Sequence, residues 1–300
     1  MKRPGIIIAA AVLLLGCTCC RMKVSRPMLK MLVEAMSKPS EALFYADSCR
    51  NLIAVPYVEG GDEAEVMDIY YADEAVRKNA VLVDIHGGFY IGGRREGNRA
   101  FASVFLRAGY DVVLVEYRLN DGKRDVSDEI SDCAAAIAYL IAHSRELDLN
   151  PDAVFLTGDS AGGHLALYLA ERHFTPRAVL LNCPAYDFAS FVNTDAFTAS
   201  ALTWFMGPNY KDTEYLSTLS PRTFIKDYSG PLFLSTCTND FIRGESLKLL
   251  EDRNALGLET KFVDIESGDR KVGHVHNVTD PSLPESRKVN AAMIEFMSKH

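Results

Sequence analysis

The sequence VFLTGDSAGGHLAL occupies residues 154–167 and joins two segments of different character. The first is a short apolar run, residues 153–156, typical of a buried strand; the second, residues 161–170, is small and apolar at helical spacing. Between them lies Gly158-x-Ser160-x-Gly162, the pattern of a nucleophile elbow, in which a strand turns directly into a helix and a Cβ at either glycine would clash. Such a turn exposes the serine hydroxyl at the helix N-terminus, where free N–H groups and a positive dipole suit an oxyanion.

The composition bounds the protein class. The chain has 300 residues, 48% of them apolar, which is enough for one large domain with a sizeable core. The formal net charge is −8 and the Lys and Arg residues are scattered. Because a nucleic-acid-binding protein needs a basic face, no nucleic-acid partner is expected.

The first twenty residues have the character of an export leader. A basic Lys2-Arg3 pair precedes an unbroken apolar run over residues 6–15, which is short for a membrane span. The sequence Leu14-Leu15-Gly16-Cys17 resembles a bacterial lipobox, although a residue smaller than Leu15 is usual at its position. Residues 1–20 are therefore predicted to be a cleaved signal, a leader lipidated at Cys17 or an uncleaved membrane anchor. Each alternative places the protein outside the cytoplasm, membrane-anchored or periplasmic.

Four cysteines lie beyond the leader, widely separated and without a C-x-x-C motif: Cys49, Cys133, Cys183 and Cys237. Neither a metal-ligand spacing nor a disulfide framework is apparent in this pattern. We interpret these residues as buried free thiols. No metal and no cofactor is expected.

Apolar runs and helical patterns alternate along residues 21–300, which are predicted to form one α/β domain. The first two runs are separated by the turn-rich Glu59-Gly60-Gly61-Asp62, a hairpin pattern. Strands are predicted at residues 52–58, 66–71, 80–85, 111–117, 153–156, 177–182, 231–237 and 260–265, and helices at 28–36, 98–108, 126–143, 161–170, 245–256 and 284–297. The alternation predicts an eight-stranded, mostly parallel sheet with helices on both faces.

Residues 188–221 break this alternation. They are rich in aromatic residues, which are Phe188, Phe191, Phe197, Trp204, Phe205, Tyr210 and Tyr215. We interpret the segment as a small helical cap that supplies apolar contacts to a substrate, with an ordinary packed excursion as the alternative.

A glycine-rich loop follows the third predicted strand, with the sequence HGGFYIGG at residues 86–93. Glycines let the backbone bend sharply and bring N–H groups close to a reacting carbonyl oxygen. In lipases and esterases a loop of this type forms part of the oxyanion hole, and the N–H that follows the serine, here that of Ala161, forms the rest.

Several motifs together resemble the hormone-sensitive-lipase-like branch of the α/β-hydrolases, from about residue 52 to the C-terminus. They are HGG at residues 86–88, EYRL at 116–119, GDSAGG at 158–163, LSP at 219–221 and NDF at 239–241. The resemblance implies the α/β-hydrolase fold and an oxyanion hole with donors at Gly88, Phe89 and Ala161, hinged at Gly87. The family usually has a third glycine where Phe89 stands, so this side chain is expected to narrow or reshape the pocket.

The acid and the base of a catalytic triad are expected after late strands, since this fold orders the triad as serine, acid and histidine. Asp240 follows the seventh predicted strand and is the first candidate for the acid, ahead of Asp187 and Glu245. His274 and His276 both follow the last strand. We favour His274, because the family loop usually reads His-x-aromatic and His276 then takes the aromatic position.

The sequence thus predicts a serine carboxylesterase in which Ser160 attacks an ester carbonyl, His274 exchanges the proton and Asp240 orients the imidazole. The resemblance implies small-molecule esters with short acyl chains. The alternatives are an amidase or peptidase that uses the same triad, and a non-catalytic α/β-hydrolase used for binding. The oligomeric state is not predicted.

Overall fold

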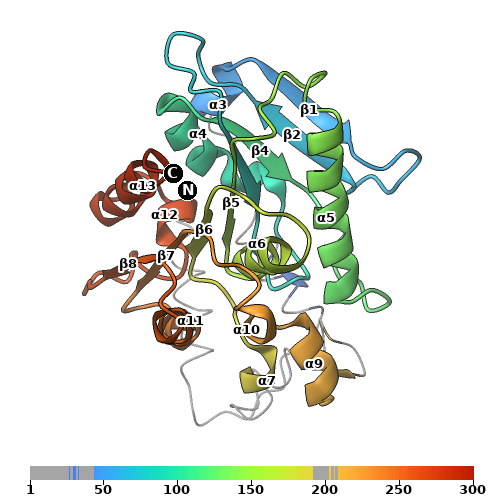
Figure 1. Cartoon of the computed structure of the whole chain (residues 1–300), viewed down its shortest axis with the longest axis vertical. Helices are drawn as coiled ribbons and strands as arrows, with labels where there is room; N and C mark the ends of the chain where they lie inside the picture. The colour runs from blue at the N-terminus through green and yellow to red at the C-terminus, as the bar shows by residue number, and fades with distance from the viewer. Residues whose placement is uncertain are drawn as a thin grey trace.

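A computed structural model describes residues 44–191 and 209–300, together with Pro27, Lys30, Met31, Val33, Thr203 and Met206. In this part of the chain, eight strands form one sheet in the order β1-β2-β4-β3-β5-β6-β7-β8 (Figure 1). The strands are β1 (Asn51–Pro56), β2 (Val66–Tyr70), β3 (Val81–Ile85), β4 (Asp111–Val115), β5 (Val154–Asp159), β6 (Val179–Asn182), β7 (Leu232–Cys237) and β8 (Thr260–Ile265). The predicted eight-stranded α/β sheet is confirmed, with strand ends that differ by a few residues.

The direction of the strands follows from the connections. The hairpin joins β1 and β2 as antiparallel neighbours, and β2 is also antiparallel to β4. From β4 through β8 every pair is parallel, as crossover connections through helices require. The chain runs from β3 outward to β4 and then returns to place β5 on the other side of β3. Such a reversal leaves a crevice at the carboxyl ends of the strands, where ligands of open α/β sheets bind.

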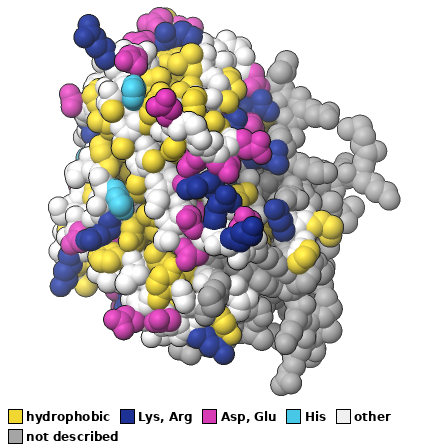
Figure 2. Space-filling model, turned by 90° about the vertical axis from the view of Figure 1, so that its right-hand side faces the viewer, with side chains coloured by type: hydrophobic (Ala, Val, Ile, Leu, Met, Phe, Trp, Pro, Cys, Tyr) yellow, Lys and Arg dark blue, Asp and Glu magenta, His cyan; other side chains and the backbone are white. Residues whose placement is uncertain are grey.

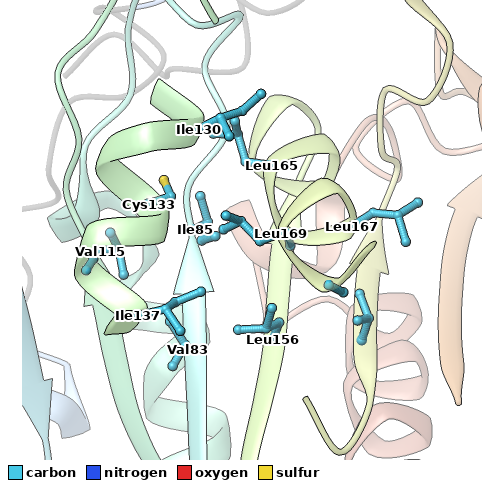
Figure 3. Packing of buried hydrophobic residues seen from close by; sticks show 14 of the residues in the cluster. Val83, Ile85, Val115, Ile130, Cys133, Ile137, Leu156, Leu165, Leu167 and Leu169 are labelled. Carbon is cyan, nitrogen blue, oxygen red and sulfur yellow. The ribbon is translucent and has the colours of Figure 1, made fainter. Parts of the chain in front are cut away.

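Helices cover both faces of the sheet. One core cluster contains α5 (Val126–Ala142), α6 (Ala161–Arg172) and α11 (Arg243–Ala255). A second cluster, on the other face, contains α4 (Arg99–Arg107) and α13 (Pro284–Met297). Figure 3 shows how Ile137 of α5 and Leu169 of α6 pack with Val83 and Leu156 of the strands. Successive residues of each central strand point to opposite faces and are buried on both, hence the continuous apolar runs in the sequence.

Short helical segments fill the connections. Two of them fall in the segment predicted to be a helical cap, and the others were not predicted from the sequence. The short segments are α3 (Tyr45–Ser48), the 3-10 helix η1 (Arg95–Asn98), α7 (Phe188–Phe191), α9 (Thr213–Leu219), α10 (Pro221–Phe224) and α12 (His276–Thr279). All of them except α9 have four residues, about one turn, which leaves no amphipathic period to recognise in the sequence. The packed positions of these segments come from tertiary contacts instead.

Strand β1 lies at one edge of the sheet and contains an irregularity. Its register with β2 shifts between Leu52 and Val55. At this point Ala54 has φ 55° and donates its N–H to Asp68 Oδ1 over 2.8 Å. Leu52 and Ile53 beside the shift are 42% and 53% exposed. The edge strand therefore combines an exposed apolar surface with a local β-bulge.

The predicted cap, residues 188–221, is only partly covered by the described residues. Phe197, Trp204 and Phe205 lie outside them, whereas α7, α9 and the start of α10 lie inside. Phe188 is buried against His164 of α6, with ring centroids 4.5 Å apart. Tyr215 of α9 donates to Asp125 Oδ2, at the N-terminus of α5, over 2.5 Å. These parts of the segment are thus packed on the helices that cover the sheet.

The predicted leader, residues 1–20, lies outside the described residues, as does most of the predicted helix at 28–36. Of that helix, Val33 is buried against Gly92 of the glycine-rich loop, while Met31 is 65% exposed. Among the helices that the structure describes, none has the length and apolar character needed to cross a bilayer. On the face shown in Figure 2, Lys and Arg side chains lie among Asp and Glu side chains rather than in a stripe of one charge.

Candidate active site

Ser160 stands at the turn between β5 and α6. Its backbone has φ 54° and ψ −116°, a conformation that costs a non-glycine residue about 1–3 kcal/mol. The turn is held by a hydrogen bond from Ser160 N–H to Asn182 O of β6, 2.9 Å long, and Ser160 O accepts from His164 N of α6. Ser160 is half-buried and occupies the N-cap position of α6. The hydroxyl therefore lies at the positive end of a helix dipole.

The glycines of the elbow are required by close backbone contacts. A Cβ on Gly162 would lie 1.9 Å from Ile85 O, and one on Gly158 would lie 2.2 Å from Gly162 O. Neither contact is possible for a real carbon atom, and both neighbours are backbone that cannot rotate away. The first turn of α6 therefore packs directly on the end of β3, which brings the elbow beside the glycine-rich loop.

The glycine-rich loop begins directly after β3 and turns through unusual backbone conformations. Gly88 has φ 136°, while Phe89 and Tyr90 have φ 55° and 62°. The turn closes on Gly88 O, which accepts from the N–H groups of Ile91 (3.2 Å) and Gly92 (3.0 Å). At Gly87 a Cβ would lie 2.5 Å from Asp159 Oδ2, so this residue lies against the one that precedes Ser160. The structure thus places the loop predicted to form an oxyanion hole next to the predicted nucleophile.

Beneath the loop, His86 is fixed by buried partners. Its Nε2 lies 2.9 Å from Glu116 Oε1, its ring stacks on Tyr117 with centroids 4.4 Å apart, and Tyr117 Oη donates to His86 O over 2.7 Å. Burial alone would lower the pKa of His86, but the negative charge of Glu116 and the hydrogen bond to it outweigh burial and raise the pKa. His86 therefore supports the loop, and Glu116 and Tyr117 of the EYRL motif hold it in place.

Two buried carboxyl groups lie behind the loop. Asn98 Nδ2 donates both to Asp84 Oδ2 (2.8 Å) and to Asp159 Oδ1 (3.0 Å), which brings the two acids to one site. Burial and the charge of Asp159 raise the pKa of Asp84 to about 8, and burial also raises the pKa of Asp159. Two carboxylates this close cannot both ionise cheaply, so the site holds a proton near neutral pH. Sequence reasoning missed this group, because Asp159 lies 61 residues along the chain from Asn98, which joins it to Asp84.

Asp240 and His274 come together after β7 and β8, as predicted. His274 Nδ1 lies 2.6 Å from Asp240 Oδ1. The carboxylate also accepts from Thr236 Oγ1 (2.8 Å) and from Ile242 N–H (3.1 Å). Burial works to raise the pKa of Asp240, but the charge of His274 and these hydrogen bonds outweigh it, so the pKa lies below its usual value. Asp240 is thus an ionised, fully engaged partner for the imidazole.

The alternative acids and the alternative histidine have other partners. Asp187 pairs with Lys248 Nζ (2.7 Å) and Arg222 (3.2 Å), and Glu245 accepts from the N–H groups of Tyr186 and Asp187. His276 is buried at the start of α12, where its Nδ1 lies 2.9 Å from Ser286 Oγ. Burial lowers the pKa of His276. Of the two histidines considered, His274 is therefore the one that contacts Asp240.

Residues at the carboxyl end of β6 contact both the serine elbow and the acid–base pair. Ser160 N–H bonds to Asn182 O, and the next residue, Cys183, has its sulfur within 4.8 Å of ligand atoms of both Asp240 and His274. Between these described residues the structure has no hydrogen bond from Ser160 Oγ to His274. Bonds of this kind are often long in free enzymes and tighten when substrate binds.

Cys183 was predicted only as a buried thiol, and its place beside Asp240 and His274 was missed. Together the three side chains offer the N, O and S atoms of a metal-ligand set. The Asp240 oxygens, however, already accept three hydrogen bonds, and burial, with the charge of Asp240, raises the pKa of the thiol well above its usual value. Because metal binding needs a thiolate and free lone pairs, the cluster suits proton chemistry better than a cation.

Two aromatic rings stand next to the histidine. Phe241 lies against His274 with ring centroids 4.4 Å apart, and Phe89 stacks on Phe241 at 5.8 Å with the planes within 4° of parallel. Phe241 is 50% exposed, which is unusual for a large apolar side chain. The two rings thus form an aromatic wall, Phe89 and Phe241, beside His274.

Comparisons with known proteins find relatives among lipases and hydrolases. The chain is 35% identical over 98 residues to Lipase 2 of Moraxella sp., a segment that covers 32% of this chain and 22% of the relative. It is 25% identical over 217 residues to a putative alpha/beta hydrolase of Acanthamoeba polyphaga mimivirus, covering 66% of this chain and 60% of the relative. These matches thus span from about a fifth to three-fifths of the length of the curated relatives.

Among solved structures, esterase B of Lactobacillus rhamnosus matches with a TM-score of 0.76 at 24% identity, covering 100% of this chain and 96% of the other. The same esterase has been solved with a tributyrin phosphonate inhibitor, and that structure matches with a TM-score of 0.74. At this identity the likeness shows the fold. It confirms the α/β-hydrolase fold that the sequence motifs predicted.

A family model described as BD-FAE matches residues 67–243, which is more than half of the chain. The match runs from β2 to the start of α11 and includes the glycine-rich loop, the elbow and Asp240. The chain therefore belongs to the BD-FAE family and has the α/β-hydrolase fold.

Proposed function

We propose that this protein is a serine carboxylesterase that hydrolyses small-molecule esters through an acyl-enzyme intermediate. The observation that carries the proposal is the 2.6 Å contact between His274 Nδ1 and Asp240 Oδ1, formed at the same edge of the sheet as the strained Ser160 elbow. A base oriented by a buried acid, beside a serine at a helix N-terminus, is the arrangement that activates a hydroxyl.

The mechanism assigns one task to each residue. Ser160 Oγ attacks the ester carbonyl while His274 takes its proton, and the new C–O bond leaves negative charge on the carbonyl oxygen. His274 returns the proton to the departing alcohol as the scissile C–O bond breaks. Water then attacks the acyl-Ser160 ester by the same route and frees the carboxylic acid. Asp240 holds the imidazole in the required tautomer and stabilises its cation.

The backbone N–H groups of Gly88, Phe89 and Ala161 are proposed to hold the oxyanion, with Gly87 as the hinge of the loop. Each such donor typically contributes about a hundred- to a thousand-fold in rate, because it is already oriented toward the charge that develops. The positive φ angles at Gly88 and Phe89 support this role. They reorient successive N–H groups in a loop, where no helix or strand uses these groups as hydrogen-bond donors.

Short acyl chains are proposed as the preferred acyl group. The aromatic wall, Phe89 and Phe241, stands beside His274 and leaves less room than the glycine that the family usually has in place of Phe89. The structurally similar esterase B, inhibited by a tributyrin phosphonate, supports the same size class. Such a wall favours small acyl groups and an apolar surface for the rest of the ester.

The test is a series of p-nitrophenyl esters with acyl chains of two, four, eight and twelve carbons, together with p-nitroacetanilide as an amide. Wild type should cleave the two shortest esters fastest and the amide slowest. Ser160→Ala should lose at least about ten-thousand-fold in kcat. Equal turnover by Ser160→Ala would end the proposal, and preference for the amide would favour an amidase. Inactivity toward every substrate would favour a binding protein.

Export is proposed from residues 1–20, with Cys17 as the site of lipidation and the cap, residues 188–221, as part of the exported domain. The full chain and a Cys17→Ala variant should be compared by cell fractionation. Loss of membrane association in Cys17→Ala would support a lipid anchor. Unchanged association would favour an uncleaved anchor, and a soluble exported wild type would favour a cleaved signal.

A further inference from the structure

Cys183 occupies a position between the serine elbow and the histidine loop. The residue before it, Asn182, accepts Ser160 N–H on its backbone oxygen (2.9 Å) and the Asn277 side chain on its Oδ1 (2.7 Å). Cys183 itself has φ 49° and donates its N–H to Ser235 O of β7 over 2.8 Å. Its side chain is therefore placed by backbone contacts to both neighbouring strands.

The thiol contacts the histidine loop directly. Cys183 Sγ accepts the N–H of Val275, the residue that follows His274, over 3.4 Å. Val275 has φ 50°, a left-handed conformation that is rare for a β-branched side chain and strained by about 1–3 kcal/mol. A strained backbone persists only where its surroundings fix it, and the hydrogen bond to the sulfur is one of the contacts that fix Val275.

The thiol also faces the acid. Cys183 is 2% exposed, and its sulfur lies within 4.8 Å of a carboxylate oxygen of Asp240. Burial first, and then the charge of Asp240, raise the pKa of Cys183 well above its usual value, so the group remains a thiol at neutral pH. A thiol offers one donor and a weak acceptor, which match the carboxylate on one side and the Val275 N–H on the other.

We propose that Cys183 is a positioning residue of the acid–base pair: its sulfur accepts Val275 N–H and fixes the backbone next to His274, while its S–H donates to Asp240. The expected effect of Cys183 on the rate of hydrolysis rests on the proposed function. Its expected effect on the His274 imidazole rests on the described contacts alone. The thiol thereby couples the orientation of the acid to that of the base.

Removal of the S–H donor of Cys183 should shift the titration of His274 in a defined direction. With one hydrogen bond fewer, the charge of Asp240 is less neutralised and stabilises the His274 imidazolium more strongly, so His274 should titrate at higher pH. The other titratable groups that face the pair are Asp159 after β5, Cys237 after β7 and His276 in α12. None of these is altered by a substitution at Cys183. A side chain that only fills space would leave the titration where it is.

The experiment compares wild type with Cys183→Ala, Cys183→Ser and Cys133→Ala. The serine keeps a donor and an acceptor at position 183, and Cys133 is a fully buried thiol on α5 that controls for the loss of a buried sulfur. The ring titration of His274 is followed by NMR on histidine-labelled protein, with His274→Gln to assign the signal. This readout requires no turnover, so it remains valid if the chain proves not to be an esterase.

In Cys183→Ala the His274 titration should move upward by several tenths of a pH unit, and kcat on p-nitrophenyl butyrate should fall about tenfold with KM within twofold, as expected for one lost hydrogen bond. Cys183→Ser and Cys133→Ala should titrate like wild type. If Cys183→Ala does not fold, Cys183→Gly replaces it, since glycine favours φ 49°. A titration unchanged in Cys183→Ala, or equally displaced in Cys183→Ser, would overturn the proposal. If the wild-type protein does not hydrolyse the ester, that result would count against the proposed esterase activity and not against the role of Cys183.

Discussion

The serine side of the candidate site and its acid–base side are built by different means. On the serine side, which comprises the elbow and the loop at residues 86–93, backbone packs on backbone: a Cβ on Gly162 would lie 1.9 Å from Ile85 O. On the acid–base side, which comprises Asp240 and His274, side chains hold each other through hydrogen bonds of 2.6–3.1 Å. Geometry on the first side is set by the fold, and on the second by a few polar atoms.

This difference teaches which changes the molecule tolerates. Added volume on the serine side must displace main chain and therefore disturbs folding together with activity. A polar atom changed on the acid–base side leaves the main chain in place and acts on the chemistry. Variants on the serine side should accordingly lose both activity and stability, whereas variants on the acid–base side should lose activity and keep most of their stability.

Asp240→Asn should give the largest loss of activity. The amide keeps the shape but has a single acceptor oxygen, so it retains either the bond from Thr236 or the bond from Ile242 N–H. It also does not hold the productive imidazole tautomer, so kcat should fall about ten-thousand-fold. The measurement is kcat on p-nitrophenyl butyrate together with the melting temperature, which should fall by only a few degrees. Asp187→Asn is the matched control and should keep kcat within about tenfold. The reverse ranking of the two variants would assign the acid to Asp187.

Stability of the same variant should depend on pH in a defined direction. The pKa of Asp240 lies below its unfolded value, so its ionisation stabilises the fold above about pH 4, and this contribution is lost as the pH falls. Melting temperatures of wild type and Asp240→Asn should therefore converge in acid. A constant difference between them from pH 7 to pH 3 would contradict this.

Gly162→Ala should reduce activity about a hundred- to a thousand-fold and also lower the melting temperature. The added carbon must displace the backbone of Ile85, at the end of β3, and of His86, which follows it, at a cost of about 3 kcal/mol. Gly244→Ala in α11 is the control, because a Cβ there meets nothing within 4 Å. The control should be neutral or stabilising by up to about 1 kcal/mol. A Gly162→Ala protein as stable as wild type would break the distinction between the two sides.

Much of this architecture could be predicted from the sequence, because it depends on local patterns. Continuous apolar runs identify strands buried on two faces, and the hairpin turn sets the direction of β1 and β2. The contact between His274 and Asp240 was also predicted, since both follow late strands of a parallel sheet. The association of Cys183 with them was not, because only the order β6-β7-β8 brings position 183 next to loops 57 and 91 residues away.

The choice between His274 and His276 shows the limit of a motif. Both follow β8, and spacing alone left the second histidine open. The structure separates them by burial: His276 begins α12, is buried and contacts Ser286, while His274 is only partly buried and contacts the buried Asp240. The φ of 50° at Val275 turns the chain between them, and no local sequence pattern predicts a left-handed valine.

Thr236→Val should have a smaller effect than either change above. It removes one of the three hydrogen bonds to Asp240 and nearly preserves the volume of the side chain. A loss of about tenfold in kcat is expected, with KM unchanged. Thr238→Val is a suitable control, because its hydroxyl bonds to Ile265 O rather than to the acid. Equal losses of kcat in both variants would show that the hydrogen bond from Thr236 to Asp240 does not contribute specifically to activity.

Asp84→Asn should affect activity least and pH-dependent stability most. Asp84 has a folded pKa of about 8, above its unfolded value, so the folded protein binds the extra proton between about pH 4 and pH 8 and loses stability as the pH rises through that range. The decline should be at least about 1.4 kcal/mol, the equivalent of one pKa unit. Asp84→Asn carries no such proton and should flatten the decline, which thermal unfolding from pH 4 to pH 9 measures. An unchanged slope would contradict the sharing of a proton between Asp84 and Asp159.

The bulge in β1 has a consequence for how copies of this protein meet. An edge strand with exposed Leu52 and Ile53 could otherwise extend its ladder into a second molecule, the usual beginning of sheet-to-sheet aggregation. Ala54 interrupts the ladder and turns its N–H inward to Asp68, so an incoming strand would find neither a straight edge nor a free donor at that point. Asp68→Ala would release that donor, and turbidity on prolonged incubation should rise above that of wild type.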